Sequence, residues 1–412
     1  MLMEKYTMTS LNYYYFLLAI IMMGSVGMFA TDIYLPALPL MTVDFNCSQT
    51  DIQISFTVFL LGLASCQLLA GMLADRFGRK RVAIIGFSLF TVASILCAYA
   101  NNLTQLIIFR LLQAAGAGVG SVLSRILVID RYDRQQAIKV FSTTFPIIGL
   151  SATIGPSIGG YLTSFWGWRA PFFFIAAYGF IMLLFACFVL NGKHENVQND
   201  HANVKEVNSY RFQNYLGVIC NLEFLGYVFI ICASFCVFRS YSVESPFVFN
   251  SQGYAPEEMG SFYIAPSVAY ILGNLLAKKL INTRSVEKVL RIGISIFVLG
   301  GLCMIGATFA FGENVHAVIL TMSIIVLGNG FLFPISSAGA MTSVRTEVSG
   351  TASGIIGAMQ FVLAAFCTNL VGEVCHGRAF PLSIFLGTII FVGLCSYLWL
   401  VVYKPRARVT AS

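Results

Sequence analysis

The chain has 412 residues, of which 58% are hydrophobic and only 10% are charged, and its formal net charge is +7. Soluble domains carry about a quarter charged residues, so this composition excludes an ordinary soluble protein and indicates a chain that spans a membrane. The positive charge does not indicate a nucleic-acid partner, because the basic residues stand in short segments beside apolar runs. The eleven cysteines show no CxxC or Cys/His spacing, so we expect neither a disulfide framework nor a metal site.

Apolar runs long enough to cross a bilayer, roughly 20 residues each, recur about twelve times along the chain. In chain order they cover residues 13–38, 52–73, 82–100, 106–126, 140–162, 171–190, 216–243, 259–280, 289–311, 315–338, 350–371 and 381–403. The first run is too long for a cleaved signal peptide, so we expect it to be retained as a spanning helix. The pattern predicts an all-α membrane protein with twelve transmembrane helices.

One long polar stretch, residues 191–214, divides the runs six and six. We therefore predict an N-terminal six-helix bundle (1–190), a linker (191–214) and a C-terminal six-helix bundle (215–412). The end of the eighth run, Gly273-Asn-Leu-Leu-Ala-Lys-Lys, echoes the end of the second, Gly71-Met-Leu-Ala-Asp-Arg. Parallel repeats of this kind predict two bundles around a central cavity that opens alternately to each side.

The basic residues predict the orientation of the chain. If both termini and the linker lie on one side, that side collects all of the 25 Lys and Arg residues except Arg110, Arg169, Arg239 and Arg378. By the positive-inside rule that side is cytoplasmic. We expect a multi-pass protein of the bacterial inner membrane, with both termini and the linker in the cytoplasm.

Residues 71–81 read Gly-Met-Leu-Ala-Asp-Arg-Phe-Gly-Arg-Lys-Arg and stand between the second and third runs. They resemble the loop 2–3 signature of the major facilitator superfamily, and the matching positions include Gly71, Asp75, Arg76, Gly78 and Arg79. The resemblance implies a cytoplasmic gate formed by these residues with Arg125 and Asp130, which follow the fourth run. Ordinary surface ion pairing is the alternative for the charged members.

The first run contains Ala30-Thr-Asp-Ile-Tyr-Leu-Pro-Ala-Leu-Pro39. An acidic residue within a membrane helix is costly, so Asp32 needs a partner, water or a substrate. The stretch resembles the helix 1 signature of the twelve-helix drug:proton antiporters, in particular the bicyclomycin and chloramphenicol resistance branch. The resemblance implies that Asp32 couples transport to protons. The alternative is a carboxylate that caps backbone where Pro36 and Pro39 disturb the helix.

Arg110 and Gln113 lie in the fourth run, within Phe109-Arg-Leu-Leu-Gln-Ala-Ala-Gly-Ala-Gly118. An arginine keeps its charge, so at this depth it needs an acceptor or a wet cavity. The stretch resembles the R-x-x-q-G-x-g signature of the family, except that Ala114 stands where glycine is usual. The resemblance implies a role for Arg110 in proton transfer, and an arginine that only holds helix 1 to helix 4 is the alternative.

The fifth run carries Gly149 and then Gly155-Pro-Ser-Ile-Gly-Gly160. Glycines permit close helix packing, and Pro156 removes a backbone donor. The stretch resembles the signature G-x-x-x-G-P-x-x-G-G of antiporters, carried here by Gly149, Gly155, Pro156, Gly159 and Gly160, although the flanking residues 150–154 depart from it. This resemblance favours export over uptake.

The seventh run adds two acids and one base. Ser245-Pro-Phe-Val248 matches the bicyclomycin resistance branch, but Arg239 and Glu244 depart from it. They either face the cavity, with Tyr34 and Gln113, and bind substrate, or pair with each other at the periplasmic rim, where Pro246 ends the apolar run. Glu223, about two turns into the helix, is a second candidate for proton coupling after Asp32.

The chain lacks a G-x-x-x-x-G-K-[ST] phosphate loop and any nucleophile with an adjacent base, so we expect neither ATP drive nor an enzyme. The predicted function is a proton-driven antiporter that exports drugs or related small molecules, works as a monomer and needs no cofactor besides the proton gradient. The alternatives are a dedicated carrier of a polar metabolite such as a siderophore, motivated by Arg239 and Glu244, and a membrane sensor that no longer transports.

Overall fold

The computed structural model describes residues 10–132, 134–188, 217–344 and 348–410. Within these ranges the regular structure is helical. The elements are α1 (Ser10–Asp32), η1 (Leu35–Ala37), α2 (Leu38–Asp44), α3 (Gln49–Phe77), α4 (Arg79–Ala98), α5 (Leu103–Arg131), α6 (Arg134–Trp166), α7 (Ala170–Phe188), α9 (Leu222–Ser251), α10 (Pro256–Phe262), α11 (Ile264–Ile281), α12 (Val286–Phe311), α13 (Val315–Thr342), α14 (Ser349–Cys375) and α15 (Ala379–Thr410).

Several helices begin at a side chain that caps free backbone N–H groups. Asn102, Asn221 and Asn314 accept hydrogen bonds from the backbone three residues further on, at 2.9 to 3.1 Å. Ser48 and Asp51 form a capping box at the start of α3. Such caps satisfy donors that helix starts leave free, which is why short polar connections suffice between long apolar helices.

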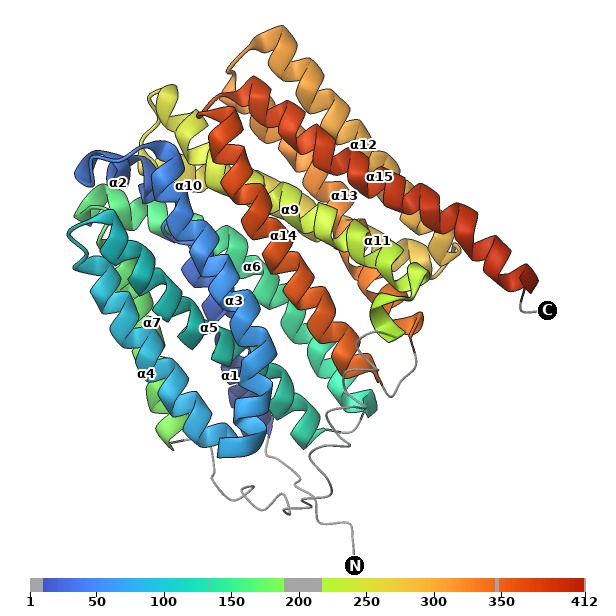
Figure 1. The fold of residues 1–412 in the computed structure, drawn as a ribbon, viewed down its shortest axis with the longest axis horizontal. Helices are drawn as coiled ribbons and strands as arrows, with labels where there is room; N and C mark the ends of the chain where they lie inside the picture. The colour runs from blue at the N-terminus through green and yellow to red at the C-terminus, as the bar shows by residue number, and fades with distance from the viewer. Residues whose placement is uncertain (1–9, 133, 189–216, 345–347, 411–412) are drawn as a thin grey trace, which may run out of the picture.

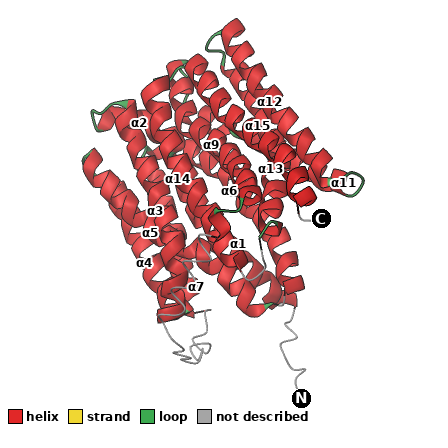
Figure 2. Cartoon of the chain, turned by 45° about the vertical axis from the view of Figure 1, so that its right-hand side comes forward, coloured by secondary structure: helices red, strands yellow, loops and turns green. Residues whose placement is uncertain are grey.

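The predicted all-α membrane fold is confirmed. Ten helical stretches among the described residues are long and apolar enough to cross a membrane. Two more helices, α3 and α6, have 29 and 33 residues, which exceeds the roughly 20 that a span requires. Figure 2 shows the long helices running side by side from one end of the molecule to the other.

The helices gather in two groups, α1–α7 and α9–α15, which lie side by side (Figure 1). The groups meet where α14 packs on α3 and where α10 packs on α6. One end of the molecule carries α2 and α10, and we call it the α2 end. The opposite end carries the turn at Gly78, and we call it the Gly78 end. The predicted linker, residues 191–214, lies outside the described residues, so the division into domains stays a prediction.

The first apolar run is not one continuous helix. α1 ends at Asp32, a short 3-10 turn follows at Leu35–Ala37, and α2 continues to Asp44. Pro36 and Pro39 sit in the first turns of η1 and α2, where proline is tolerated because the missing N–H would be unpaired anyway. The helix therefore breaks directly after its one acidic residue.

The prediction that Pro246 ends the seventh helix is wrong, because α9 continues through it to Ser251. A proline inside a helix leaves the carbonyl four residues earlier, here that of Ser242, without its usual donor. The hydroxyl of Tyr263 donates to this carbonyl oxygen at 3.1 Å and also lies 2.7 Å from the Ser245 hydroxyl. A side chain from the α10–α11 junction thus replaces the missing backbone bond.

Candidate functional site

Asp32 and Arg239 form a buried ion pair in the middle of the molecule. Asp32 closes α1, Arg239 projects from α9, and the two side chains are 1% and 2% exposed. Arg239 Nη1 donates to Asp32 Oδ1, which ties the first helix group to the second. The predicted need of Asp32 for a partner is met by a guanidinium, and no backbone N–H of the described residues donates to its carboxylate.

Arg239 has further contacts that fix its position. Its Nη2 lies 3.1 Å from the sulfur of Met28 on α1, and its guanidinium lies 5.1 Å and 5.5 Å from the ring centres of Phe235 and Phe238. Aromatic faces stabilise a desolvated cation. Asp32 Oδ2, by contrast, has no hydrogen-bond partner among the described residues. This second carboxylate oxygen is buried as well, and within the pair only Oδ1 is bonded.

Arg110 lies beside this pair and is fully buried. It donates to the Ala30 carbonyl oxygen at 3.1 Å and to Gln113 Oε1 at 2.6 Å, and its guanidinium lies 3.9 Å and 4.3 Å from the ring centres of Phe59 and Tyr34. Its charge is near enough to Asp32 to interact with it electrostatically. The bond to Ala30 joins α5 to α1, as the structural alternative for Arg110 predicts.

Gln113 continues the network away from Arg110. Its Nε2 donates to the Ser94 hydroxyl on α4 at 2.8 Å, so α1, α5 and α4 are joined by one chain of hydrogen bonds. This chain fixes the position of Arg110 Nη1, which donates to both Ala30 and Gln113. Arg110 Nε and Nη2 stay without a partner among the described residues.

Glu244 lies five residues beyond Arg239 and makes a separate set of bonds. Its carboxylate accepts from Gln49 Nε2 and Gln53 Nε2 on α3, both at 2.8 Å, and from the backbone N–H of Gly377 at 2.7 Å. The alternative in which Arg239 and Glu244 pair with each other is therefore wrong. Both side chains are buried, and each one bonds across to the first helix group.

Two partners in these contacts were missed from the sequence. Gln49 and Gln53 stand at the start of the second apolar run, one turn apart, and place two amides on one face of α3. The signal was their spacing, since residues four apart share a helix face. The spacing alone does not identify Glu244 as the acceptor of these amides, because the sequence does not show which face of α3 meets α9.

Glu223 was predicted two turns inside the seventh helix, and that placement is wrong. It lies in the first turn of α9, two residues after the capping residue Asn221, and is half-buried. An acid at this position is favoured by the partial positive charge of the helix N-terminus. Its position is thus explained without a role in proton transfer.

The predicted gate residues lie at the Gly78 end. Gly78 joins α3 to α4 with a φ of 87°, a backbone angle that side chains disfavour, which accounts for the glycine. Arg79 pairs with Asp130 at 3.1 Å, and this pair is partly exposed. Arg125 instead donates to Gln67 Oε1 at 3.4 Å and to the Ser121 carbonyl oxygen at 3.3 Å.

Among the described residues, no side-chain hydrogen bond or ion pair joins Arg76 or Gly71 to the other members of the predicted gate. Arg76 is exposed with its guanidinium 5.3 Å from the Phe77 ring centre, and a side chain at Gly71 would meet open space. The side chain of Asp75 lies outside the described residues.

The glycines of α6 form a contact with both helix groups at the α2 end. A Cβ on Gly159 would lie 2.6 Å from the Ile33 carbonyl carbon, and one on Gly155 would lie 3.3 Å from Asp32 Cβ. On the other side of α6, a Cβ on Gly160 would lie 3.1 Å from Glu257 Cα of α10. The buried Pro156 follows Gly155, and the surroundings of Gly149 lie outside the described residues. The motif therefore packs directly against the break that follows Asp32.

The four residues predicted to line a substrate cavity, Tyr34, Gln113, Arg239 and Glu244, are all buried in this conformation. Tyr34 packs on Phe172 with ring centres 5.6 Å apart, and the other three have the partners described above. The structure brings Tyr34, Gln113 and Arg239 to the charge cluster around Asp32 and Arg110. Glu244 stands apart from them, beside Gln49 and Gln53.

Comparisons with known proteins place this arrangement in a family. A family model described as Major Facilitator Superfamily matches residues 16–368. A "Bicyclomycin resistance protein homolog" of Haemophilus influenzae is 24% identical over 397 residues, which cover 95% of this chain and 98% of that protein. "Multidrug resistance protein D" of Escherichia coli is 26% identical over 355 residues, which cover 86% and 87%.

Solved structures agree at the level of the fold. The crystal structure of a D-xylose-proton symporter superposes with a TM-score of 0.74 at 15% sequence identity, over 94% of this chain and 97% of that one. At this identity the likeness supports the arrangement of the helices and leaves the substrate open.

Proposed function

The chain belongs to the Major Facilitator Superfamily, and from that premise we propose that it is a proton-coupled antiporter that exports drugs or related small molecules across the inner membrane of a bacterium. Its relatives include proteins named for bicyclomycin resistance and multidrug resistance. The proposed driving force is the proton gradient, and the proposed unit is a single chain embedded in the bilayer.

One observation carries the proposal. Asp32, directly before the break in the first helix, is held by Arg239 of the other helix group. This pair exists only while Asp32 is ionised, because a protonated carboxyl has no charge for the guanidinium to balance. Proton binding to Asp32 and contact between the two groups are thus linked through the same atoms.

The proposed cycle follows from that link. With the α2 end closed and the ion pair intact, Asp32 holds no proton, and a substrate entering from the cytoplasm separates Asp32 from Arg239. The α2 end then opens to the outside, Asp32 takes up a proton through its free Oδ2, and the substrate leaves. Return to the closed form restores the pair and releases the proton inside. Proton and substrate thus bias one two-state equilibrium in opposite directions.

Closure of the α2 end is supported by further bonds between the groups. The Thr50 hydroxyl donates to the Gly372 carbonyl oxygen at 3.2 Å, and the Ser157 hydroxyl donates to the Gly260 carbonyl oxygen at 3.1 Å. Glu244 adds its bonds to Gln49 and Gln53. We propose that the α2 end faces the outside and that these bonds break in the outward-open form.

We do not propose a dedicated carrier of a polar metabolite. That alternative depended on Arg239 and Glu244 as charges in need of a substrate, and both have protein partners here. A buried charge with such partners requires no ligand to explain it.

Drug susceptibility tests the proposal in cells. Expression in a strain without its own efflux pumps is expected to raise the inhibitory concentration of chloramphenicol-like drugs, and Asp32→Asn is expected to abolish the increase at equal protein level. Arg378→Gln, which removes an exposed charge at the α2 end, serves as the control and should keep it. An increase that survives Asp32→Asn would disprove the proposed role of Asp32.

A further inference from the structure

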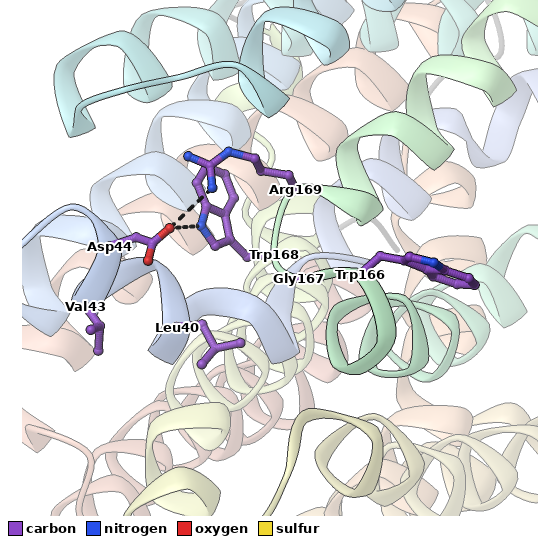
Figure 3. A pocket seen from close by; sticks show the side chains of 7 residues that line it. All are labelled: Leu40, Val43, Asp44, Trp166, Gly167, Trp168 and Arg169. Carbon is purple, nitrogen blue, oxygen red and sulfur yellow. Dashed lines mark hydrogen bonds and ion pairs between the residues drawn. The ribbon is translucent and has the colours of Figure 1, made fainter.

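A cavity of about 340 Å³ opens on the protein surface at the α2 end, and none of its lining residues belongs to the Asp32 cluster. It is lined by Leu40, Val43, Asp44, Trp166, Gly167, Trp168 and Arg169 (Figure 3). The candidate membrane spans Tyr14–Asp44 and Ala170–Phe188 end at its edge. The cavity therefore stands at the depth where the hydrocarbon core of a bilayer meets the headgroups.

Its walls combine an apolar rim with one charged pair. Leu40, Val43 and Trp166 are exposed at 41%, 77% and 72%, and each would contact acyl chains at this depth. Tryptophan at the end of a membrane span is typical of the interface, because its ring is apolar and its N–H is polar. The rim can thus hold the upper part of a lipid.

Asp44 and Arg169 form the charged part, and among the described residues Asp44 Oδ1 accepts no hydrogen bond and Arg169 donates only through Nη1. The Trp168 indole N–H at 2.6 Å and Arg169 Nη1 at 3.3 Å both donate to the same oxygen of Asp44, Oδ2. In Figure 3 the second carboxylate oxygen points away from both donors. The guanidinium carbon of Arg169 lies 4.2 Å from the centre of the Trp168 ring, which helps to fix the guanidinium, and both charged side chains are nearly half exposed.

We propose that this cavity binds the headgroup of phosphatidylethanolamine. The lipid carries a phosphate, which the free N–H groups of Arg169 can bind, and a primary ammonium, which can donate to the free oxygen of Asp44. The pair thus presents one charge of each sign to a headgroup that has one of each. Phosphatidylcholine lacks ammonium N–H donors, and phosphatidylglycerol lacks the amine altogether, so neither complements both residues.

Native mass spectrometry of the full-length protein in detergent tests the proposal. The delipidated protein is titrated with the dioleoyl forms of phosphatidylethanolamine, phosphatidylcholine and phosphatidylglycerol. We expect about fivefold tighter binding of phosphatidylethanolamine than of phosphatidylcholine, as for a partly exposed ion pair. Equal binding of the three lipids would overturn the proposal.

Two variants separate the charges. Arg169→Gln should remove the preference for phosphatidylethanolamine, whereas Asp44→Asn should leave a free guanidinium and shift the preference to phosphatidylglycerol. Arg378→Gln removes an exposed positive charge at the same end and should change nothing. A preference that persists in both Arg169→Gln and Asp44→Asn would contradict the assignment.

The apolar rim is tested by a variant and a matched control. Trp166 lines the cavity and its neighbour Phe165 does not, although both are 72% exposed. Trp166→Ala should weaken lipid binding and Phe165→Ala should not, a comparison that holds even if the charge variants fold poorly. Soluble glycerophosphoethanolamine should compete weakly, and competition as strong as that of the lipid would mean that the site takes a free headgroup compound instead.

Discussion

At the scale of single residues, the buried charges of Asp32, Arg110 and Arg239 form one cluster. The need of Asp32 and Arg110 for partners was predicted from their place in apolar runs, and the structure provides partners for both. The partner of Asp32 was not predicted, because Arg239 lies in another helix and the rotation of that helix is set by packing. Composition and spacing along one chain do not determine which faces of two distant helices meet.

Removing one charge of the Asp32–Arg239 pair is expected to destabilise the protein more than removing both charges. Asp32→Asn and Arg239→Gln each leave one buried charge without its partner, which typically costs about 3–5 kcal/mol. The double variant removes both charges and is expected to lose less than the two single variants added together. Thermal unfolding midpoints in one detergent measure the difference.

The control for this cycle is Arg378→Gln, whose exposed side chain should leave the midpoint unchanged. Additive losses in the double variant would show that Asp32 and Arg239 do not interact, and the proposed link between protonation and contact of the helix groups would then fail.

At the scale of elements, the positions of the long helices followed from hydrophobic runs, and a disturbance of the first helix at Pro36 and Pro39 was expected, whereas the course of α9 was not. The break after Asp32 and the continuation of α9 through Pro246 both depend on prolines. A proline allows either outcome, and the choice at Pro246 depends on a hydroxyl from Tyr263 that is distant in sequence. The consequence of a proline therefore cannot be settled from its own helix.

Tyr263→Phe is expected to destabilise α9, because the Ser242 carbonyl loses its donor. An unsatisfied buried acceptor costs about 1–3 kcal/mol. Pro246→Ala restores the backbone N–H four residues after Ser242, so it should recover part of the loss in the Tyr263→Phe background. Unfolding midpoints of the two single variants and the double variant test this, with the exposed Tyr99→Phe as the control.

A rescue that fails, or an equal effect of Tyr99→Phe, would mean that Tyr263 stabilises the helix by another contact. The hydrogen bond to the Ser242 carbonyl would then not explain why Pro246 is tolerated inside α9.

The glycines of α6 give a second prediction for an element. Gly159→Ala places a Cβ against the backbone of Ile33, which cannot move without shifting the turn beside Asp32. We expect loss of transport together with a lower unfolding midpoint. Gly306→Ala in α12 is the matched control, because a Cβ there meets open space and alanine is favoured over glycine in a helix by up to about 1 kcal/mol. Full activity of Gly159→Ala would contradict the proposed close contact between α6 and the break.

At the scale of the whole molecule, the number of long helices was predicted from length and hydropathy, because each span must be about 20 apolar residues long. The bonds that hold the two helix groups together were not predicted from the sequence. Bonds between them connect residues 32–57 and 157 to residues 239–260 and 368–372, so the α2 end is closed in this conformation. Which end of the molecule is closed depends on whether the bonds between the helix groups are stronger at one end or at the other. Sequence patterns do not show this difference.

The most direct test of proton-coupled antiport is a measurement of proton flux in proteoliposomes that contain the purified protein and hold a pH gradient, acidic inside. Addition of a chloramphenicol-like drug outside should dissipate the gradient with the wild-type protein and with Arg378→Gln, and should leave it intact with Asp32→Asn. A gradient that no drug dissipates with the wild-type protein, or one that Asp32→Asn still dissipates, would contradict the coupling of drug export to protons through Asp32.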